Sequence, residues 1–197
     1  MSDETAAHYR ILLPPGWVRM RGDDQAQEAL VRVIDERVET LAPEQRPRVR
    51  ALMRRSAEDA IGAARERGAL ELILSFATVQ GIPIPASIVL LPLPVPEDDR
   101  RPADEILLSL GRGGAHVIEI DGIPAMRRVV DTPATGPDPA HRAIHYMLRH
   151  PHSGRWLAFS ASILTSDDEG YGQVLEALET LVGAMMSTIR FSNGGSA

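Results

Sequence analysis

The stretch 117–130, VIEIDGIPAMRRVV, decides the fold class because it contains the clearest hairpin signal in the chain. Asp121 and Gly122 stand between two runs rich in branched apolar residues. An Asp-Gly pair favours a two-residue β-hairpin turn, since both central positions of that turn need a positive φ angle. We therefore predict two antiparallel strands, at 117–120 and 123–130.

Further runs with strand character lie on both sides of this hairpin. Residues 70–76 and 86–93 precede it, and residues 144–149 and 156–163 follow it. In these runs apolar residues alternate with polar ones or form short blocks, which is typical of strands. Consecutive hairpins favour an antiparallel sheet of about six to seven strands over alternating βαβ units.

Helical spacing of apolar residues predicts three helices, at about 24–41, 49–67 and from 166 onward. Pro43 and Pro47 separate the first two, so we interpret 24–67 as a helical hairpin, with Gly68 as its C-cap. The third helix has a wide apolar stripe and is expected to cover the sheet.

The predicted fold class is therefore α+β, with an antiparallel sheet and helices over one face. We expect one domain over 1–192, which contains the helical hairpin, and a flexible tail at 193–197. Residues 9–13 are expected to form a strand that ends at Pro14-Pro15-Gly16, with Trp17 as an aromatic plug. Shorter elements are predicted as a helical turn at 106–110 and a closing strand at 188–192.

Composition excludes several classes of function. The 197 residues include no cysteine, and all 21 basic residues are arginine. Disulfides, thiolate nucleophiles, cysteine zinc sites and lysine Schiff bases are therefore excluded. The sequence shows neither an apolar run of membrane-spanning length nor a signal peptide, so we expect a cytoplasmic protein without a membrane partner.

A net charge of −6 argues against binding to nucleic acid, because that affinity depends on a basic surface. Arginines nevertheless crowd the second helix. Arg54 precedes Glu58 by four residues and Arg55 precedes Asp59 by four, which predicts rows of mixed sign on a solvated helix face.

Four histidines form the one cluster that suggests a metal site: His141, His145, His150 and His152. Imidazoles bind transition metals, and on a strand each pair shares a face. No Asp or Glu lies between Asp138 and Asp167, and the H-E-x-x-H pattern is missing. We therefore favour a tolerant loop and strand face, and assign no metal and no cofactor.

The usual signatures of catalysis are missing as well. No G-x-S-x-G occurs, and Ser160 and Ser162 fall on outward strand positions. The glycine-rich run at 111–114 precedes a strand pattern, so we interpret it as a turn and not as a dinucleotide loop. No spacing pairs the carboxylates near the predicted strands, which are Glu71, Glu119 and Asp121. The sequence assigns no catalytic residue.

Several segments together resemble the PsbP-like α/β superfamily, which includes a photosystem II extrinsic subunit, a Ran-binding import factor and LpqN-type lipoproteins. The segments are LPPGW at 13–17, DGIPAMR at 121–127, the strand with Tyr146, WLAFS at 156–160 and TIRF at 188–191. The resemblance implies an antiparallel sheet flanked by helices, and a family whose members mostly bind proteins. It supplies no catalytic residues. The helical hairpin is longer than that fold leads us to expect.

We therefore expect a non-enzymatic bacterial protein that acts as a protein-binding or accessory module. Arginine in place of lysine is typical of a GC-rich, for example actinobacterial, genome. An exposed apolar patch is expected on the helical hairpin or beside Trp17. The candidate binding surface contains Trp17, Glu119, His145 and Tyr146.

Two other interpretations stay open. The chain is alternatively a small-ligand-binding protein or hydrolase, in which a cleft between sheet and helical hairpin collects His145, Tyr146 or Glu119. Methionines at 126, 147, 185 and 186 fit either an adaptable binding surface or a core. The expected partner is a protein, and a homodimer stays open.

Overall fold

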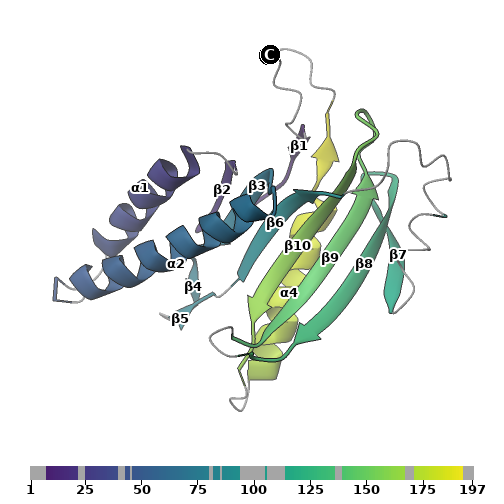
Figure 1. Ribbon diagram of the computed structural model, residues 1–197. Coiled ribbons are helices and arrows are strands. Elements are labelled where there is room, and N and C mark those ends of the chain that lie inside the picture. Colours follow the sequence, from purple (N-terminus) through teal and green to yellow (C-terminus); the bar gives the residue numbers. More distant parts are fainter. Residues whose placement is uncertain are drawn as a thin grey trace.

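A seven-stranded antiparallel sheet in the order β2-β3-β6-β10-β9-β8-β7 forms the centre of the computed structural model (Figure 1). The structure describes residues 8–21, 25–39, 43–44, 46–79, 82–84, 86–93, 105, 114–135, 139–166 and 171–192. The strands are β2 (Trp17–Arg21), β3 (Glu71–Ser75), β6 (Ala86–Pro92), β7 (Ala115–Ile120), β8 (Ile123–Thr132), β9 (His141–Arg149) and β10 (Trp156–Leu164). The prediction of an α+β fold with an antiparallel sheet is confirmed.

Helices and short ribbons complete the described part of the chain. The helices are α1 (Gln25–Glu39), α2 (Arg46–Glu66) and α4 (Tyr171–Ser187). The short strands are β1 (Tyr9–Arg10), which pairs with β11 (Arg190–Phe191), and β4 (Thr78–Val79), which pairs with β5 (Ile82–Pro83). None of the described helices is long and apolar enough to cross a membrane.

One face of the sheet packs against α4, and we call it the α4 face. Leu178, Val182 and Met185 of α4 join Ile88 and Phe159 of the sheet in one buried cluster. Phe159 lies on β10 at the middle of the sheet and is fully buried. In Figure 1, α4 lies behind β10 and β9. The predicted cover of the sheet by the C-terminal helix is confirmed.

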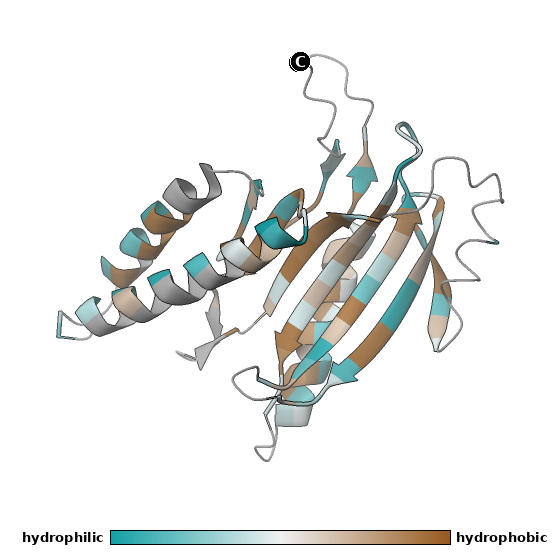
Figure 2. Cartoon of the chain, in the orientation of Figure 1, coloured by the Kyte–Doolittle hydropathy of each residue, from teal (hydrophilic) through white to brown (hydrophobic). Residues whose placement is uncertain are grey.

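The opposite face is covered by α1 and α2 over β2, β3 and β6, so the expectation of helices on one face was wrong. Leu72 lies on this face, because neighbouring Ile73 belongs to the α4 face and successive strand residues alternate. Around Leu72 the buried cluster collects Met20, Leu30, Ile34, Val38, Ile61 and Ala64. Brown segments of α1 and α2 in Figure 2 mark apolar residues of these helices.

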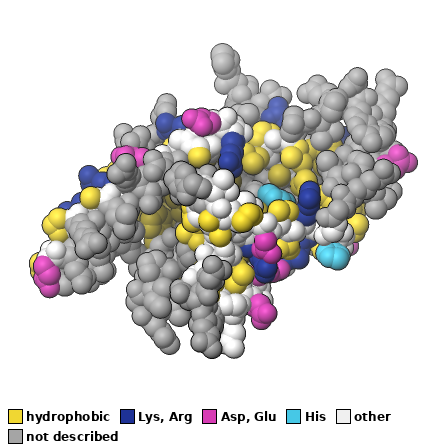
Figure 3. Space-filling view, turned by 60° about the horizontal axis from the view of Figure 1, so that its bottom comes forward, with side chains coloured by type: hydrophobic (Ala, Val, Ile, Leu, Met, Phe, Trp, Pro, Cys, Tyr) yellow, Lys and Arg dark blue, Asp and Glu magenta, His cyan; other side chains and the backbone are white. Residues whose placement is uncertain are grey.

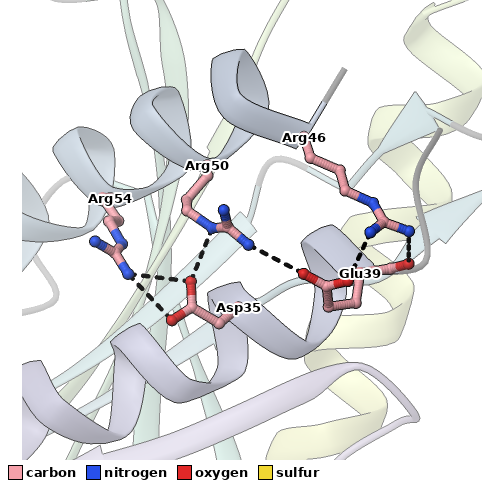
Figure 4. A network of polar contacts seen from close by, with 5 residues as sticks. All are labelled: Asp35, Glu39, Arg46, Arg50 and Arg54. Atoms are coloured by element: carbon pink, nitrogen blue, oxygen red, sulfur yellow. Dashed lines mark hydrogen bonds and ion pairs between the residues drawn. The ribbon is translucent and has the colours of Figure 1, made fainter. Parts of the chain in front are cut away.

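Ion pairs join the C-terminal part of α1 to the N-terminal part of α2 (Figure 4). Arg50 and Arg54 of α2 bind the Asp35 carboxylate of α1 at 3.0 and 3.1 Å, and Arg46 binds Glu39 at 2.7 Å. The partners predicted for this arginine cluster were acids one turn away on the same helix, whereas the observed partners lie on the neighbouring helix. Residues 40–42 and 45 lie outside the described residues, so the turn of the predicted helical hairpin is not described.

The Asp-Gly hairpin forms as predicted. Asp121 and Gly122 have φ angles of 54° and 74°, and β7 pairs with β8 on either side of them. The Asp121 carboxylate has a second role that the sequence did not reveal, because it accepts a hydrogen bond of 2.8 Å from the Phe191 backbone N–H. The turn thereby holds β11, the closing strand predicted at 188–192.

The N-terminal strand differs from the prediction. The structure has β1 at Tyr9–Arg10 and a separate edge strand β2 at Trp17–Arg21, where we expected one strand and an aromatic plug. Trp17 does pack into the core of the α4 face. The predicted helical turn at 106–110, the start of the third helix at 166–170 and the tail lie largely outside the described residues.

Replacing Phe159 with alanine tests how far the fold depends on the α4 face. We expect a loss of about 3–5 kcal/mol in the free energy of unfolding, because removal of the ring leaves a cavity between α4 and the middle of the sheet. Leu164→Ala, on the same strand but 40% exposed, should cost less than about 1 kcal/mol. Urea denaturation followed by circular dichroism measures both, and equal losses would contradict this assignment of the core.

Candidate binding site

Three polar residues form one row across the centre of the sheet: Arg128 of β8, His145 of β9 and Ser160 of β10. Arg128 is the Cα partner of His145, and His145 is the Cα partner of Ser160. Residues directly opposite one another in antiparallel strands share a face, so all three side chains lie on the face opposite α4. The Ser160 Oγ and His145 Nδ1 atoms are 3.0 Å apart, which is hydrogen-bonding distance.

His145 is neutral at neutral pH. Burial lowers the pKa of its imidazole, and the charge of Arg128 lowers it further. In the neutral tautomer whose Nδ1 accepts a hydrogen bond from the Ser160 hydroxyl, Nε2 carries the ring proton and is a hydrogen-bond donor.

Arg128 lacks a counter-charge among the described residues. Its side chain is half-buried, and its Nε atom is enclosed without a hydrogen-bond partner. The adjacent Arg127 on the α4 face contrasts with it, because Arg127 binds Glu179 of α4. Arg142 of β9 binds both Asp131 and Glu179. Arginines on the α4 face of these strands therefore have carboxylate partners, and Arg128 on the opposite face does not.

We call the surface around this row the open half. It consists of the central opposite-face residues of β8, β9 and β10, which are Met126, Arg128, Val130, Ala143, His145, Met147, Ala158, Ser160 and Ser162. Seven of these side chains are half-buried, whereas Met126 and Ala158 are buried. Met126 packs with Trp156 and Met147 in a small cluster of its own, separate from the cluster under α1 and α2. Figure 3 shows histidine and arginine side chains among hydrophobic ones on one side of the molecule. The open half thus combines small, apolar and cationic groups.

A second polar centre lies at the β2 edge of the sheet. Arg19 of β2 binds both carboxylate oxygens of Glu71 on β3, at 2.7 and 2.8 Å, and the Tyr9 hydroxyl donates to the same carboxylate at 2.6 Å. The Arg19 guanidinium also lies 4.1 Å from the centre of the Tyr9 ring. Burial and the Glu71 charge raise the pKa of Tyr9, which stays protonated. These contacts hold β1 on the sheet.

A cleft of about 430 Å³ opens beside this second centre. Its lining residues are His8, Tyr9, Arg10, Arg19, Met20, Arg21, Glu71 and Ser192. Arg19 and Glu71 satisfy each other there, and the Tyr9 hydroxyl is satisfied by Glu71. The buried groups of the cleft are therefore a structural clamp, whereas the open half contains an unsatisfied one.

The structure does not bring the four residues of the predicted binding surface together. Trp17 is buried in the core on β2, and Glu119 is exposed on β7 at the other edge of the sheet. His145 and Tyr146 follow one another on β9 and point to opposite faces, with Tyr146 fully buried on the α4 face. Only His145 lies in the open half. Trp17 itself is 7% exposed and so is not part of an exposed apolar patch.

The four histidines are also spread out. His141 and His145 lie on β9, and His150 and His152 lie in the turn before β10. His150 Nδ1 accepts the backbone N–H groups of His152 and Ser153. Among the described residues no three His, Asp or Glu side chains are placed to hold a metal ion. The histidine pattern instead divides between a turn and the open half.

Arg128 was missed by the sequence analysis, and so was the Arg19–Glu71 pair. Two consecutive arginines on a strand carry no signal about which one has a partner. The partner of each depends on helices and strands far away in the sequence, such as Glu179 for Arg127. Ser160 was correctly placed on an outward position, but its contact with His145 required the register of β9 and β10.

Comparison with known proteins adds no residue to the open half or to the clamp at the β2 edge. No family model matches the chain, and no curated protein matches it significantly.

Glu71→Gln tests the clamp at the β2 edge. We expect a loss of about 2 kcal/mol in the free energy of unfolding, because half-buried Arg19 loses its counter-charge. Glu36→Gln, an exposed change on α1, is the matched control and should have little effect. Chemical denaturation measures both variants. Similar values for the two would show that the clamp does not support the fold.

His150→Asn tests the role of the buried imidazole through pH. Burial lowers the pKa of His150, and the charge of His152 adds to the shift, so the unfolded chain takes up a proton that the folded chain resists. Stability should therefore fall in wild type as pH drops from about 6.5 toward the folded-state pKa. Asparagine keeps an acceptor near Nδ1 without titrating, so the loss should be smaller.

Urea midpoints at pH 7 and pH 5 give the comparison for this variant. Exposed His116→Asn is the control and should keep the wild-type dependence on pH. An unchanged dependence in His150→Asn would contradict the assigned role.

Proposed function

We propose that this chain is a non-enzymatic binding module that takes a segment of a protein partner on its open half. One observation carries the proposal: α1 and α2 pack over β2, β3 and β6, while the same face of β8, β9 and β10 has a half-buried surface outside that cluster. A row of polar groups crosses this surface at Arg128, His145 and Ser160.

The composition of the open half supports a protein as the partner. Met147 offers a half-buried, flexible side chain that can adapt to a partner, and Met and Arg are enriched in protein interfaces. Small side chains at Ala143 and Ser162 leave room beside them. Two of the exposed large hydrophobic residues lie on this same face, Val117 on the neighbouring strand β7 and Leu164 at the end of β10. The other two, Leu12 and Val174, lie away from these strands. We therefore place recognition on the open half.

A hydrolase is the second candidate, and the Ser160–His145 contact favours it. A serine hydroxyl within hydrogen-bonding distance of a neutral histidine is the arrangement of a nucleophile and its base. A third group that orients the histidine completes such sites, and among the described residues no carboxylate contacts His145. Hydrolysis of short ester substrates that disappears in Ser160→Ala would favour this candidate over the binding module.

Membership of the PsbP-like superfamily belongs to the same proposal. Its support is an antiparallel sheet with helices on its faces, together with the segments at 13–17, 121–127 and 156–160. A role in binding proteins agrees with what that resemblance implies. A bacterial origin, a cytoplasmic location and a homodimer remain predictions from the sequence.

Ala143→Trp tests the proposed function by filling the open half. Ala143 is opposite Ser162 and Val130, so the indole should cover the surface where the partner segment lies. We expect the yield of a partner captured from a lysate of the encoding organism to fall at least about tenfold. A loss of this size is typical when a central contact of an interface is removed. Quantitative mass spectrometry of the captured proteins gives the measurement.

Gln173→Trp is the matched control, because it adds the same side chain at an exposed position of α4. Its capture should equal that of wild type, and circular dichroism should show both variants folded. A partner lost equally in both variants, or retained in both, would place recognition away from the open half.

A further inference from the structure

We infer that the open half receives a carboxylate of the partner segment, held by the Arg128 guanidinium beside His145. This inference rests on the proposed function, because it names the group that the same surface recognises.

The argument begins with the charges on the strands. Arg127 and Arg128 are consecutive on β8 and point to opposite faces. Arg127 binds Glu179, Arg142 binds Asp131 and Glu179, and Arg19 binds Glu71. Within the described residues Arg128 has neither an ion pair nor a hydrogen bond, although its Nε is enclosed. Arg128 thus differs from these half-buried arginines in lacking an anion.

An unpaired guanidinium in this position is unfavourable for folding. A cation removed from water without a partner loses hydration that nothing replaces. Buried polar groups without partners are rare in folded proteins and call for a specific explanation. A ligand that brings an anion would supply the missing partner at Arg128.

No acid of β7, β8, β9 or β10 supplies the missing anion at Arg128. Glu119 of β7 is on the same face as Arg128. In the pairing of the two strands, however, Glu119 lies opposite Pro124, which is four residues from Arg128 along β8. At the rise of a strand this separation is about 13 Å, well beyond an ion pair. Asp131 points to the α4 face, where it binds Arg142. No acid among the described residues therefore pairs with Arg128, which leaves its charge for a ligand.

The neighbours of Arg128 suit an acceptor group. Ser160 is within hydrogen-bonding distance of His145 Nδ1, and the tautomer that accepts this hydrogen bond has its proton on Nε2. Nε2 has no partner in the described part of the chain. Arg128 and His145 then both present donors, which fit the two oxygens of a carboxylate.

The charge of the site favours a carboxylate over a phosphate. Arg128 contributes one positive charge, and the burial that keeps His145 neutral prevents it from adding a second. A carboxylate has one negative charge, whereas a phosphate group has nearly two at neutral pH. The ligand expected from charge balance is therefore an Asp or Glu side chain, or a chain terminus.

Titration of the full chain with acetate tests the inference directly. NMR of the histidine ring signals, with His145 assigned through His145→Asn, should show saturable shifts of the His145 ring as acetate replaces chloride at constant ionic strength. Arg128→Gln should weaken this binding at least about tenfold, as expected for the loss of a charged hydrogen bond. Phosphate in place of acetate should bind more weakly.

Arg10→Gln is the matched control, since Arg10 is an exposed arginine on β1. It should bind acetate as wild type does. Binding that survives Arg128→Gln, shifts that do not saturate, or tighter binding of phosphate than of acetate would each overturn the inference.

A comparison of two neighbouring substitutions gives an independent readout. Arg127→Met should lower the melting temperature, because it breaks a pair with Glu179. Arg128→Met should leave the melting temperature unchanged or raise it, because an unpaired charge is replaced by an apolar side chain. Equal destabilisation by both would mean that Arg128 has a structural partner and would overturn the inference.

Failure of this inference can be separated from failure of the proposed function. If acetate does not bind but Ala143→Trp still abolishes partner capture, the open half binds a partner through other groups. If acetate binds at Arg128 but capture does not depend on Ala143, the anion site stands and its occupant is not the captured protein.

Discussion

This structure depends on the alternation of side chains between the two faces of β8, β9 and β10. The antiparallel register of these strands fixes which side chains share a face. It sends Tyr146 to the core under α4 and His145 to the opposite face, although the two residues are neighbours. In the same way it separates Arg127 from Arg128. A shift of one residue in the register of β9 would exchange these faces, placing His145 under α4 and exposing Tyr146. The core and the proposed binding surface are therefore set by the same backbone pairing.

The chain uses most of its described ion pairs to attach one element to another. Arg46, Arg50 and Arg54 join α2 to α1, the Arg127 and Arg142 pairs with Glu179 attach α4 to the sheet, and Arg19 with Glu71 holds the N-terminal strand. Each planar guanidinium can bind two carboxylate oxygens, which suits such junctions. Arg46, Arg50 and Arg54 of the arginine-rich helix α2 are thereby paired with acids, whereas half-buried Arg128 on the sheet has no acid partner among the described residues.

Local patterns accounted for much of the fold. The Asp121-Gly122 turn was predictable because positive φ angles are a property of the turn residues themselves, and the apolar stripe of α4 was predictable because helical spacing repeats along the sequence. The strand at Trp17–Arg21 was missed because a five-residue strand after two prolines has little periodicity of its own. Helices on both faces were missed for a related reason, since amphipathic spacing says that a helix covers something but not which side of the sheet.

By itself, the sequence determined the α+β class, the antiparallel hairpins and the exclusion of thiol and lysine chemistry, because these depend on residue type and short-range spacing. Tertiary structure alone decided that Trp17 and Glu119 lie apart from His145, and that Arg128, His145 and Ser160 form one row. The physical reason is that a contact across a sheet depends on the register between strands distant in the chain. Whether a charge is paired depends likewise on which distant acid the fold brings beside it.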